Sequence, residues 1–182
     1  MKTFFQQEWM EKVVILVIPP ESYGYVSSTI PIEIAKEWDM EGVFVSMNKP
    51  YLTEVESFTE SGIIEKIIFV DCASKLAGDS PSGDRLIVVR NPADLTELTI
   101  SITKGIAMLP KNKFLIFDSL TTLLIYSKLT PVTRFAHSLG LKMKSKKITS
   151  LFLAVEQETG KEMLKFLSTM ADNLIYLRNE KH

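Results

Sequence analysis

Runs of apolar residues rich in β-branched side chains recur along the chain, separated by polar turns. The first run, VVILVI at Val13–Ile18, is apolar at every position instead of alternating with polar residues. Strands of this kind are typical of a parallel sheet that is covered by helices on both faces. Similar runs cover 42–47, 66–71, 85–90, 113–119, 148–155 and 173–178. The pattern therefore predicts a sheet of buried strands.

Segments with helical spacing lie between many of these strands. The helix expected before Pro110 has Asp94 at its N-cap and Glu97 three residues later, a pair typical of a capping box. Helices are also expected after the second strand, with Leu52, Val55 and Phe58 on one face, at 132–144, preceded by Thr130 and Pro131, and at 160–170. Strands that alternate with helices predict an α/β fold, in which ligands bind beyond the carboxyl ends of the strands.

Composition narrows the class of protein. The 182 residues are 46% apolar, enough for the core of one domain over 1–182. With 21 Lys and Arg against 22 Asp and Glu, no excess charge would attract nucleic acid or an anionic membrane. The single cysteine, Cys72, excludes an internal disulfide, and no uninterrupted apolar segment reaches the roughly 18 residues of a membrane span. These features predict a cytoplasmic protein with no membrane segment.

The first strand leads through a short turn into a helical segment. Pro19 and Pro20 end the strand, Gly24 lies in the expected turn, and Ile30 and Ile34 carry the helical spacing. A phosphate-binding loop of the Walker type occupies such a junction, because its backbone N–H groups and the start of the helix hold phosphates. The pattern G-x-x-x-x-G-K-[ST] is nevertheless absent here.

Four segments, taken together and in order, point to a known superfamily. They are SSTIPIEIAKE, EGVFVSMNKPYLTEVESFTESGI, KFLIFDSLTTL and MADNLIYL. Spanning nearly the whole chain, they resemble the RecA-like ATPases and, among these, the single-domain relatives of KaiC. The resemblance implies a RecA-like parallel, or mostly parallel, twisted sheet with helices on both faces. It also implies that the strands at Val13–Ile18 and Lys113–Phe117 are neighbours in the middle.

The chain departs from this family at the phosphate loop. By the resemblance, Ser27 stands where the Walker A lysine would be, and Ser28 stands at the position of its Ser or Thr. Val26 replaces the preceding glycine and disfavours a positive φ, although Gly24 can supply one. Pro31 is comfortable only in the first turn of a helix, which places the expected N-cap near Ser28. The phosphate-contacting ammonium is therefore missing.

A second departure follows the second strand. KaiC-like hydrolases carry acidic residues there to orient the attacking water, whereas this chain has Asn48 and Lys49. Asp118 and Ser119, at the end of KFLIFDS, match the Walker B position, where the family's carboxylate helps to bind Mg²⁺ through water. The alternative is that Asp118 only caps the following turn.

Two further residues invite opposing interpretations. Lys49 either replaces the missing lysine from another strand or is a surface lysine before Pro50. Tyr23 and Tyr25 flank Gly24, where they either recognise a base or a partner, or pack over the edge of the sheet.

We expect a catalytically degenerate RecA/KaiC-like domain, a pseudo-ATPase that acts as a regulatory or assembly module. Phosphoryl transfer needs positioned cations and a positioned water, and most of those contributors are missing. The first alternative is a non-standard nucleotide-binding protein or a slow ATPase. Its site would comprise Tyr23, Gly24, Ser27, Ser28, Lys49, Asp118 and Ser119, with Asp118 as the metal ligand. The second alternative is a DNA-associated accessory subunit.

These interpretations differ in cofactors and partners. No cofactor is expected for the degenerate domain, whereas ATP with Mg²⁺ belongs to the first alternative. The expected partners are proteins, including a KaiC-like or RecA-like ATPase, while the charge balance disfavours nucleic acid. A monomer or a dimer is expected in dilute solution, because the rings of this family depend on shared nucleotide and a symmetric dimer is the most frequent closed assembly.

Overall fold

The computed structural model describes residues 5–110, 112–157 and 160–178. Its strands form one seven-stranded sheet in the order β4-β3-β2-β5-β6-β1-β7, and all the pairings are parallel. The strands are β1 (Val13–Ile18), β2 (Glu41–Ser46), β3 (Ile67–Asp71), β4 (Leu86–Val88), β5 (Lys113–Asp118), β6 (Thr149–Val155) and β7 (Asn173–Tyr176). The expected α/β fold with a parallel sheet is therefore confirmed.

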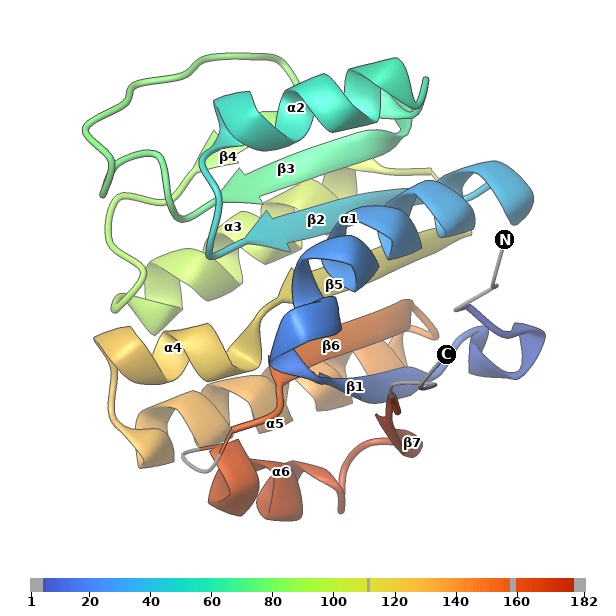
Figure 1. The fold of residues 1–182 in the computed structure, drawn as a ribbon, viewed down its shortest axis with the longest axis vertical. Helices are drawn as coiled ribbons and strands as arrows, with labels where there is room; N and C mark the ends of the chain where they lie inside the picture. Colours follow the sequence, from blue (N-terminus) through green and yellow to red (C-terminus); the bar gives the residue numbers. More distant parts are fainter. Residues whose placement is uncertain (1–4, 111, 158–159, 179–182) are drawn as a thin grey trace.

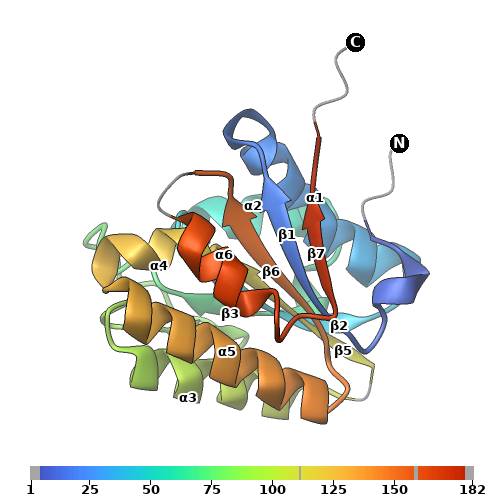
Figure 2. The same ribbon diagram turned by 90° about the horizontal axis from the view of Figure 1, so that it is seen from below.

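Helices cover both faces of the sheet (Figures 1 and 2). One layer contains α1 (Pro20–Glu37), α2 (Tyr51–Glu60) and the short 3-10 helices η1 (Gln7–Trp9) and η2 (Ile64–Lys66). The opposite layer contains α3 (Leu95–Met108), α4 (Leu120–Tyr126), α5 (Leu129–Ser145) and α6 (Lys161–Leu167). We call these the α1/α2 layer and the α3/α5 layer.

Alternate residues of each central strand supply two separate cores. In β1, Val13, Ile15 and Val17 pack beneath the α3/α5 layer, while Val14, Leu16 and Ile18 pack beneath the α1/α2 layer. All six side chains are buried, which explains why the strand is apolar throughout. Because all the strands are parallel, their carboxyl ends, and the residues that follow them, lie at one edge of the sheet.

The predicted neighbours in the centre of the sheet are wrong. β1 pairs with β6 and β7, whereas β5 pairs with β2 and β6. β6 therefore lies between the two strands that were expected to be adjacent. Alternation along the sequence indicates the type of sheet, but strand order depends on how each crossover packs.

Local predictions for the helices were partly right. Asp94 caps α3 as expected, because its carboxylate accepts hydrogen bonds from the backbone N–H groups of Thr96 and Glu97. The short helix α4 was not predicted, and α5 begins at Leu129, one turn before the expected start. In α2 the buried face was misassigned: Leu52 is 58% exposed, and Glu54 is buried in the same layer as Phe58.

Candidate functional site at the carboxyl edge of the sheet

The segment that follows β1 is a helix from its first residues, so the turn predicted around Gly24 is wrong. Pro19 is the N-cap of α1 and Pro20 is its first residue. Proline suits this position because an N–H in the first turn would have no acceptor within the helix. Gly24 and Ser28 lie inside the helix, and Pro31 is also within it instead of in its first turn. The expected N-cap at Ser28 is therefore wrong as well.

Tyr23, one turn into α1, reaches across the carboxyl edge to the end of β5. Its hydroxyl donates a hydrogen bond to Oδ1 of Asp118 and accepts one from the side-chain amide of Asn48, which follows β2. Oδ1 of Asn48 in turn accepts a hydrogen bond of 2.9 Å from Thr122 Oγ1. Segments that follow three different strands thus meet in one polar network, which we call the Tyr23 network.

Asp118 is the acidic member of this network and is only 2% exposed. Burial raises the pKa of Asp118 to about 6, against the hydrogen bond from Tyr23, which favours the ionised form. The nearby Ser27 hydroxyl also lowers this pKa, although Ser27 Oγ has no partner within hydrogen-bonding geometry among the described residues. The charge of Glu54 raises the pKa further, whereas the charge of Lys49 lowers it. The carboxylate is therefore held in a dry environment.

Burial and the adjacent carboxylate also raise the pKa of Tyr23 above its ordinary value. The phenol consequently remains protonated and acts as a hydrogen-bond donor to Asp118 throughout the neutral range. A protonated phenol beside a carboxylate supplies neither a cation nor a free base.

Lys49 forms an ion pair with a nearby buried carboxylate, that of Glu54. Its Nζ lies 3.4 Å from Oε1 of Glu54, which projects from α2 and is 2% exposed. Burial raises the pKa of Glu54, and the charge of Lys49 opposes that rise. The ammonium of Lys49 therefore neutralises a buried acid, while its side chain remains 37% exposed.

The remaining predicted site residues divide between two environments. Ser119 is fully buried, follows a cis peptide bond after Asp118, and lies 2.8 Å from Thr122 through their hydroxyl oxygens. Ser28 Oγ donates to Gly24 O at 2.9 Å within α1, so Ser28 and Gly24 take no part in the Tyr23 network.

The structure thus brings Tyr23, Ser27, Lys49, Asp118 and Ser119 together at the carboxyl edge and leaves Gly24 and Ser28 outside. Sequence reasoning missed Glu54 and Thr122. A helical wheel offers a signal for Glu54, because it shares a face with Phe58 four residues later. Nothing in the sequence distinguishes Thr122 from the threonine beside it.

Among the residues that the structure describes, no group of three or more His, Cys, Asp and Glu side chains is placed to hold a metal ion. Within the same residues, no helix is both long enough and apolar enough to cross a membrane.

The fold is similar to that of a solved KaiC-like protein from the hyperthermophilic archaeon Pyrococcus horikoshii. The two structures superpose with a TM-score of 0.60 at 12% sequence identity, over 94% of this chain and 74% of the archaeal chain. Together with the parallel sheet, this similarity identifies the fold as RecA-like. No curated protein matches the sequence.

A family model gives the relationship at the level of sequence. The model of a family of unknown function, DUF7504, matches residues 38–177. The match includes Lys49 and Asp118, and it begins after Tyr23 and the rest of the segment that replaces the phosphate loop. Because it covers well over half of the sequence, the chain belongs to the family of unknown function DUF7504.

Proposed function

We propose that this protein is a RecA-like domain that has lost ATP hydrolysis and acts as a regulatory or assembly module. The observation that carries the proposal is the hydrogen bond from Tyr23 to Asp118. The carboxylate that the family resemblance assigns to a magnesium site is here 2% exposed and is bound by a side chain of the same chain. A metal-bound water would have to displace the Tyr23 hydroxyl to reach Oδ1 of this carboxylate.

The start of α1 is a poor phosphate site. Helix N-termini bind phosphates through backbone N–H groups that have no partner in the helix. Pro20 has no N–H, and the N–H of Ser22 donates to Pro19 O at 3.0 Å. Glu21 adds a carboxylate to this first turn, where it is favourable for the helix dipole but repels an anionic ligand.

The residues at this edge therefore do not fit a magnesium–ATP complex. The start of α1 carries no cation, and Lys49 is engaged by Glu54 at 3.4 Å. Asp118 has a pKa raised to about 6, which opposes the ionised state that a magnesium site needs. Asn48 stands where a hydrolase would place an acidic residue, and both ends of its amide are used in the Tyr23 network. No step of phosphoryl transfer is derived through these groups.

Without catalysis, the protein is a RecA-like scaffold in which Tyr23 occupies the carboxylate of the family's metal site. Such a scaffold is suited to binding other proteins, and we propose a KaiC-like or RecA-like ATPase, or a second copy of the chain, as the partner. This part of the proposal rests on the fold similarity and on the closure of the site.

Isothermal titration calorimetry with ATP, ADP and GTP in the presence of Mg²⁺ tests the loss of nucleotide binding. We expect no saturable heat up to about 1 mM nucleotide, whereas a RecA-like ATPase with an intact Walker A motif serves as the positive control. Binding at micromolar or lower concentration, about 8 kcal/mol or more, would overturn the proposal.

The calorimetry also tests the alternative of a non-standard nucleotide site. Lys49 is the cation whose charge acts on Asp118, so it is the residue to test at this site. If nucleotide binds there, Lys49→Ala will weaken it, and Lys36→Ala, on the exposed side of α1, will not. Equal affinities in the two variants would exclude Lys49 from the binding site.

A further inference from the structure

The two helix layers carry opposite charge even though the whole chain has a net charge of −1. In the α1/α2 layer, α2 contains Glu54, Glu56 and Glu60 and no Lys or Arg. In the α3/α5 layer, α5 contains Arg134, Lys142 and Lys144 and no Asp or Glu. The sequence has no acidic residue at all between Asp118 and Glu156. The balance of charges in the composition therefore conceals a molecule with one acidic and one basic side.

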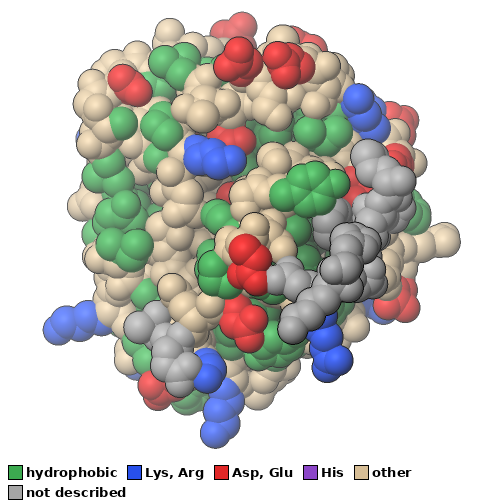
Figure 3. All heavy atoms as spheres, viewed as in Figure 1, with side chains coloured by type: hydrophobic (Ala, Val, Ile, Leu, Met, Phe, Trp, Pro, Cys, Tyr) green, Lys and Arg blue, Asp and Glu red, His purple; other side chains and the backbone are tan. Residues whose placement is uncertain are grey.

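The outer surface of α2 forms a narrow ridge with both apolar and acidic character. Leu52, Glu56 and Glu60 are spaced by four residues and so lie on one side of the helix. Leu52 is 58% exposed, and both glutamates are exposed. Neither glutamate has a hydrogen bond or an ion pair within the described part of the chain. Figure 3 shows acidic side chains gathered over α2, and we call this surface the α2 ridge.

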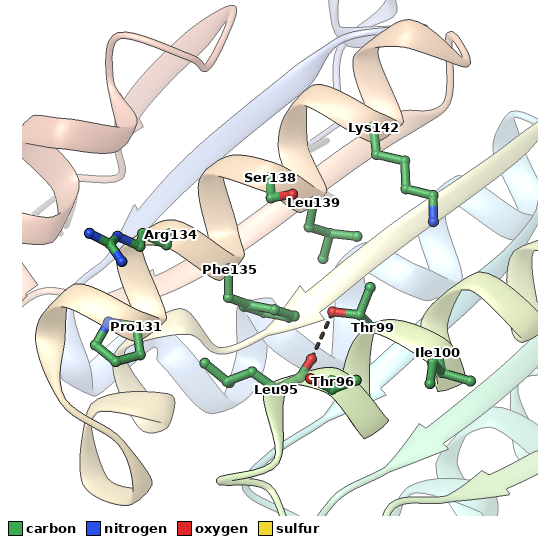
Figure 4. Close-up of a pocket in the computed structure, with 10 residues that line it drawn as sticks. All are labelled: Leu95, Thr96, Thr99, Ile100, Pro131, Arg134, Phe135, Ser138, Leu139 and Lys142. Atoms are coloured by element: carbon green, nitrogen blue, oxygen red, sulfur yellow. Dashed lines mark hydrogen bonds between the residues drawn. The ribbon is translucent and has the colours of Figure 1, made fainter.

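On the opposite side, α3 and α5 enclose a groove of about 400 Å³ (Figure 4). Leu95, Phe135 and Leu139 project into the space between the helices, and Ile100 lies on its outer margin with 63% exposure. An apolar floor of this kind favours a hydrophobic side chain from outside, since its burial removes apolar surface from water. We call it the α3/α5 groove.

The charges around the groove are positive. Arg134 and Lys142 line it, and Lys104 stands one turn after Ile100 on the exposed side of α3. Lys142 Nζ donates to Thr103 Oγ1 at 2.9 Å, while Arg134 and Lys104 have no partner among the described residues. No Asp or Glu is among the residues that line the groove. The groove is thus complementary to a partner that presents an apolar side chain with a carboxylate beside it.

We propose that the α2 ridge of one copy of this protein docks into the α3/α5 groove of a second copy. Leu52 would cover the apolar floor near Ile100, and Glu56 and Glu60 would face Lys104 and Lys142, which both lie beyond Ile100 toward the same end of the groove. The lengths are compatible, because the ten residues of α2 span about 15 Å and the fourteen of α3 about 21 Å. Both surfaces carry exposed charges that lack partners within one copy, and the contact satisfies both.

The α3/α5 groove fits an amphipathic helix better than it fits a nucleic acid. Nucleic acid binding would use the cations but would leave the apolar floor and Ile100 in water, and the groove margin has no exposed aromatic side chain to stack bases. Because the two surfaces lie on opposite sides of the sheet, their contact is head-to-tail, and a pair of copies retains one free ridge on one copy and one free groove on the other. The association therefore grows with protein concentration instead of stopping at a symmetric dimer.

Sedimentation velocity on the nucleotide-free protein tests the contact. We expect the weight-average sedimentation coefficient to rise between about 10 µM and about 500 µM protein at low salt, and this rise to be suppressed at about 1 M NaCl, where exposed ion pairs are screened. Glu56→Lys and Lys104→Glu should each weaken the association by about tenfold or more. The controls Glu65→Lys and Lys12→Glu change the net charge equally at exposed positions outside both surfaces, and they should leave it unchanged.

The decisive sample is an equimolar mixture of the Glu56→Lys and Lys104→Glu variants. It should regain association, because the intact ridge of one variant meets the intact groove of the other. Thermal unfolding of each variant checks that it is folded. A wild-type protein that stays monomeric at low salt would overturn the inference, as would a mixture that remains as weak as its components. The outcome is separable from the proposed loss of ATP binding, since every sample lacks nucleotide.

Discussion

The hydroxyl of Tyr23 and the carboxylate of Asp118 are hydrogen-bonded although 95 residues separate them in the sequence. One residue belongs to the first helix and the other ends a strand in the middle of the sheet. Their contact lies at the edge at which a parallel α/β sheet ordinarily binds its ligands.

Removal of the Tyr23 hydroxyl should destabilise the fold. In Tyr23→Phe the buried carboxylate of Asp118 loses a donor and Asn48 loses an acceptor, a change worth about 1–3 kcal/mol of the free energy of unfolding. Urea denaturation at pH 7.5 measures it. Tyr176→Phe is the matched control, because that ring is 52% exposed and should change stability little. Equal effects of the two substitutions would contradict a structural role for the Tyr23 hydroxyl.

The second prediction concerns pH and Asp118. Because burial raises its pKa from 3.8 to about 6, the folded state holds the proton more tightly than the unfolded state, and the stability contribution of this group falls as pH rises from about 4 to about 6. Asp118→Asn removes that titration and keeps an oxygen to accept from Tyr23. The variant should therefore gain stability relative to wild type across this window, by up to about 3 kcal/mol above pH 6. Chemical denaturation at a series of pH values gives the difference.

A pH-independent difference between wild type and Asp118→Asn would contradict this prediction. So would a variant that is less stable than wild type at pH 7.5, since that result requires the ionised carboxylate to be stabilised by its surroundings.

Lys49 should stabilise the fold through Glu54. Lys49→Met leaves a buried carboxylate without its countercharge, and we expect a loss of about 0.5–1 kcal/mol, since the lysine is partly exposed and its ion pair is screened. The loss should be larger at pH 8 than at pH 5, because Glu54, whose pKa is raised, takes up a proton as the pH falls. Introducing Glu54→Gln should remove most of the effect of Lys49→Met. Additive effects in this double-mutant cycle would show that the two residues are uncoupled.

Gly24 distinguishes a helix from a phosphate-binding turn. It lies inside α1, and a Cβ added there would meet nothing within 4 Å, so Gly24→Ala should stabilise the protein by about 0.5–1 kcal/mol. Gly62 has a φ of +70°, and Gly62→Ala should destabilise the protein by about 1–2 kcal/mol. Thermal unfolding of both variants checks the opposite signs. A destabilising Gly24→Ala would indicate a turn conformation and reopen the case for phosphate binding.

The sequence by itself determined those features that depend on near neighbours. The all-apolar strand Val13–Ile18 indicated a sheet covered on both faces, and six fully buried residues in β1 agree with it. The cap at Asp94 was readable because a carboxylate reaches backbone N–H groups only two and three residues ahead. The location of Asp118 at the carboxyl edge likewise followed from its place at the end of an apolar strand, because parallel strands share one carboxyl edge.

Tertiary structure decided the start of α1, and the local signals there were misleading. Gly24 and Pro31 indicated a turn and a late helix start, since proline inside a helix costs about 3 kcal/mol. The helix nevertheless extends back to Pro20, because Val26, Ile30 and Ile34 are buried against the sheet and their burial offsets that cost.

Tertiary structure also decided the order of the strands and the closure of the site. Every crossover in a parallel sheet has similar sequence signals, so nothing local placed β6 between β1 and β5. The same holds for the partners of polar groups: Asp118 meets Tyr23, and Lys49 meets the buried Glu54, because packing brings α1 and α2 over the ends of the strands. A polar residue at a strand end is visible in the sequence, whereas whether it faces a ligand or another side chain depends on contacts between distant segments.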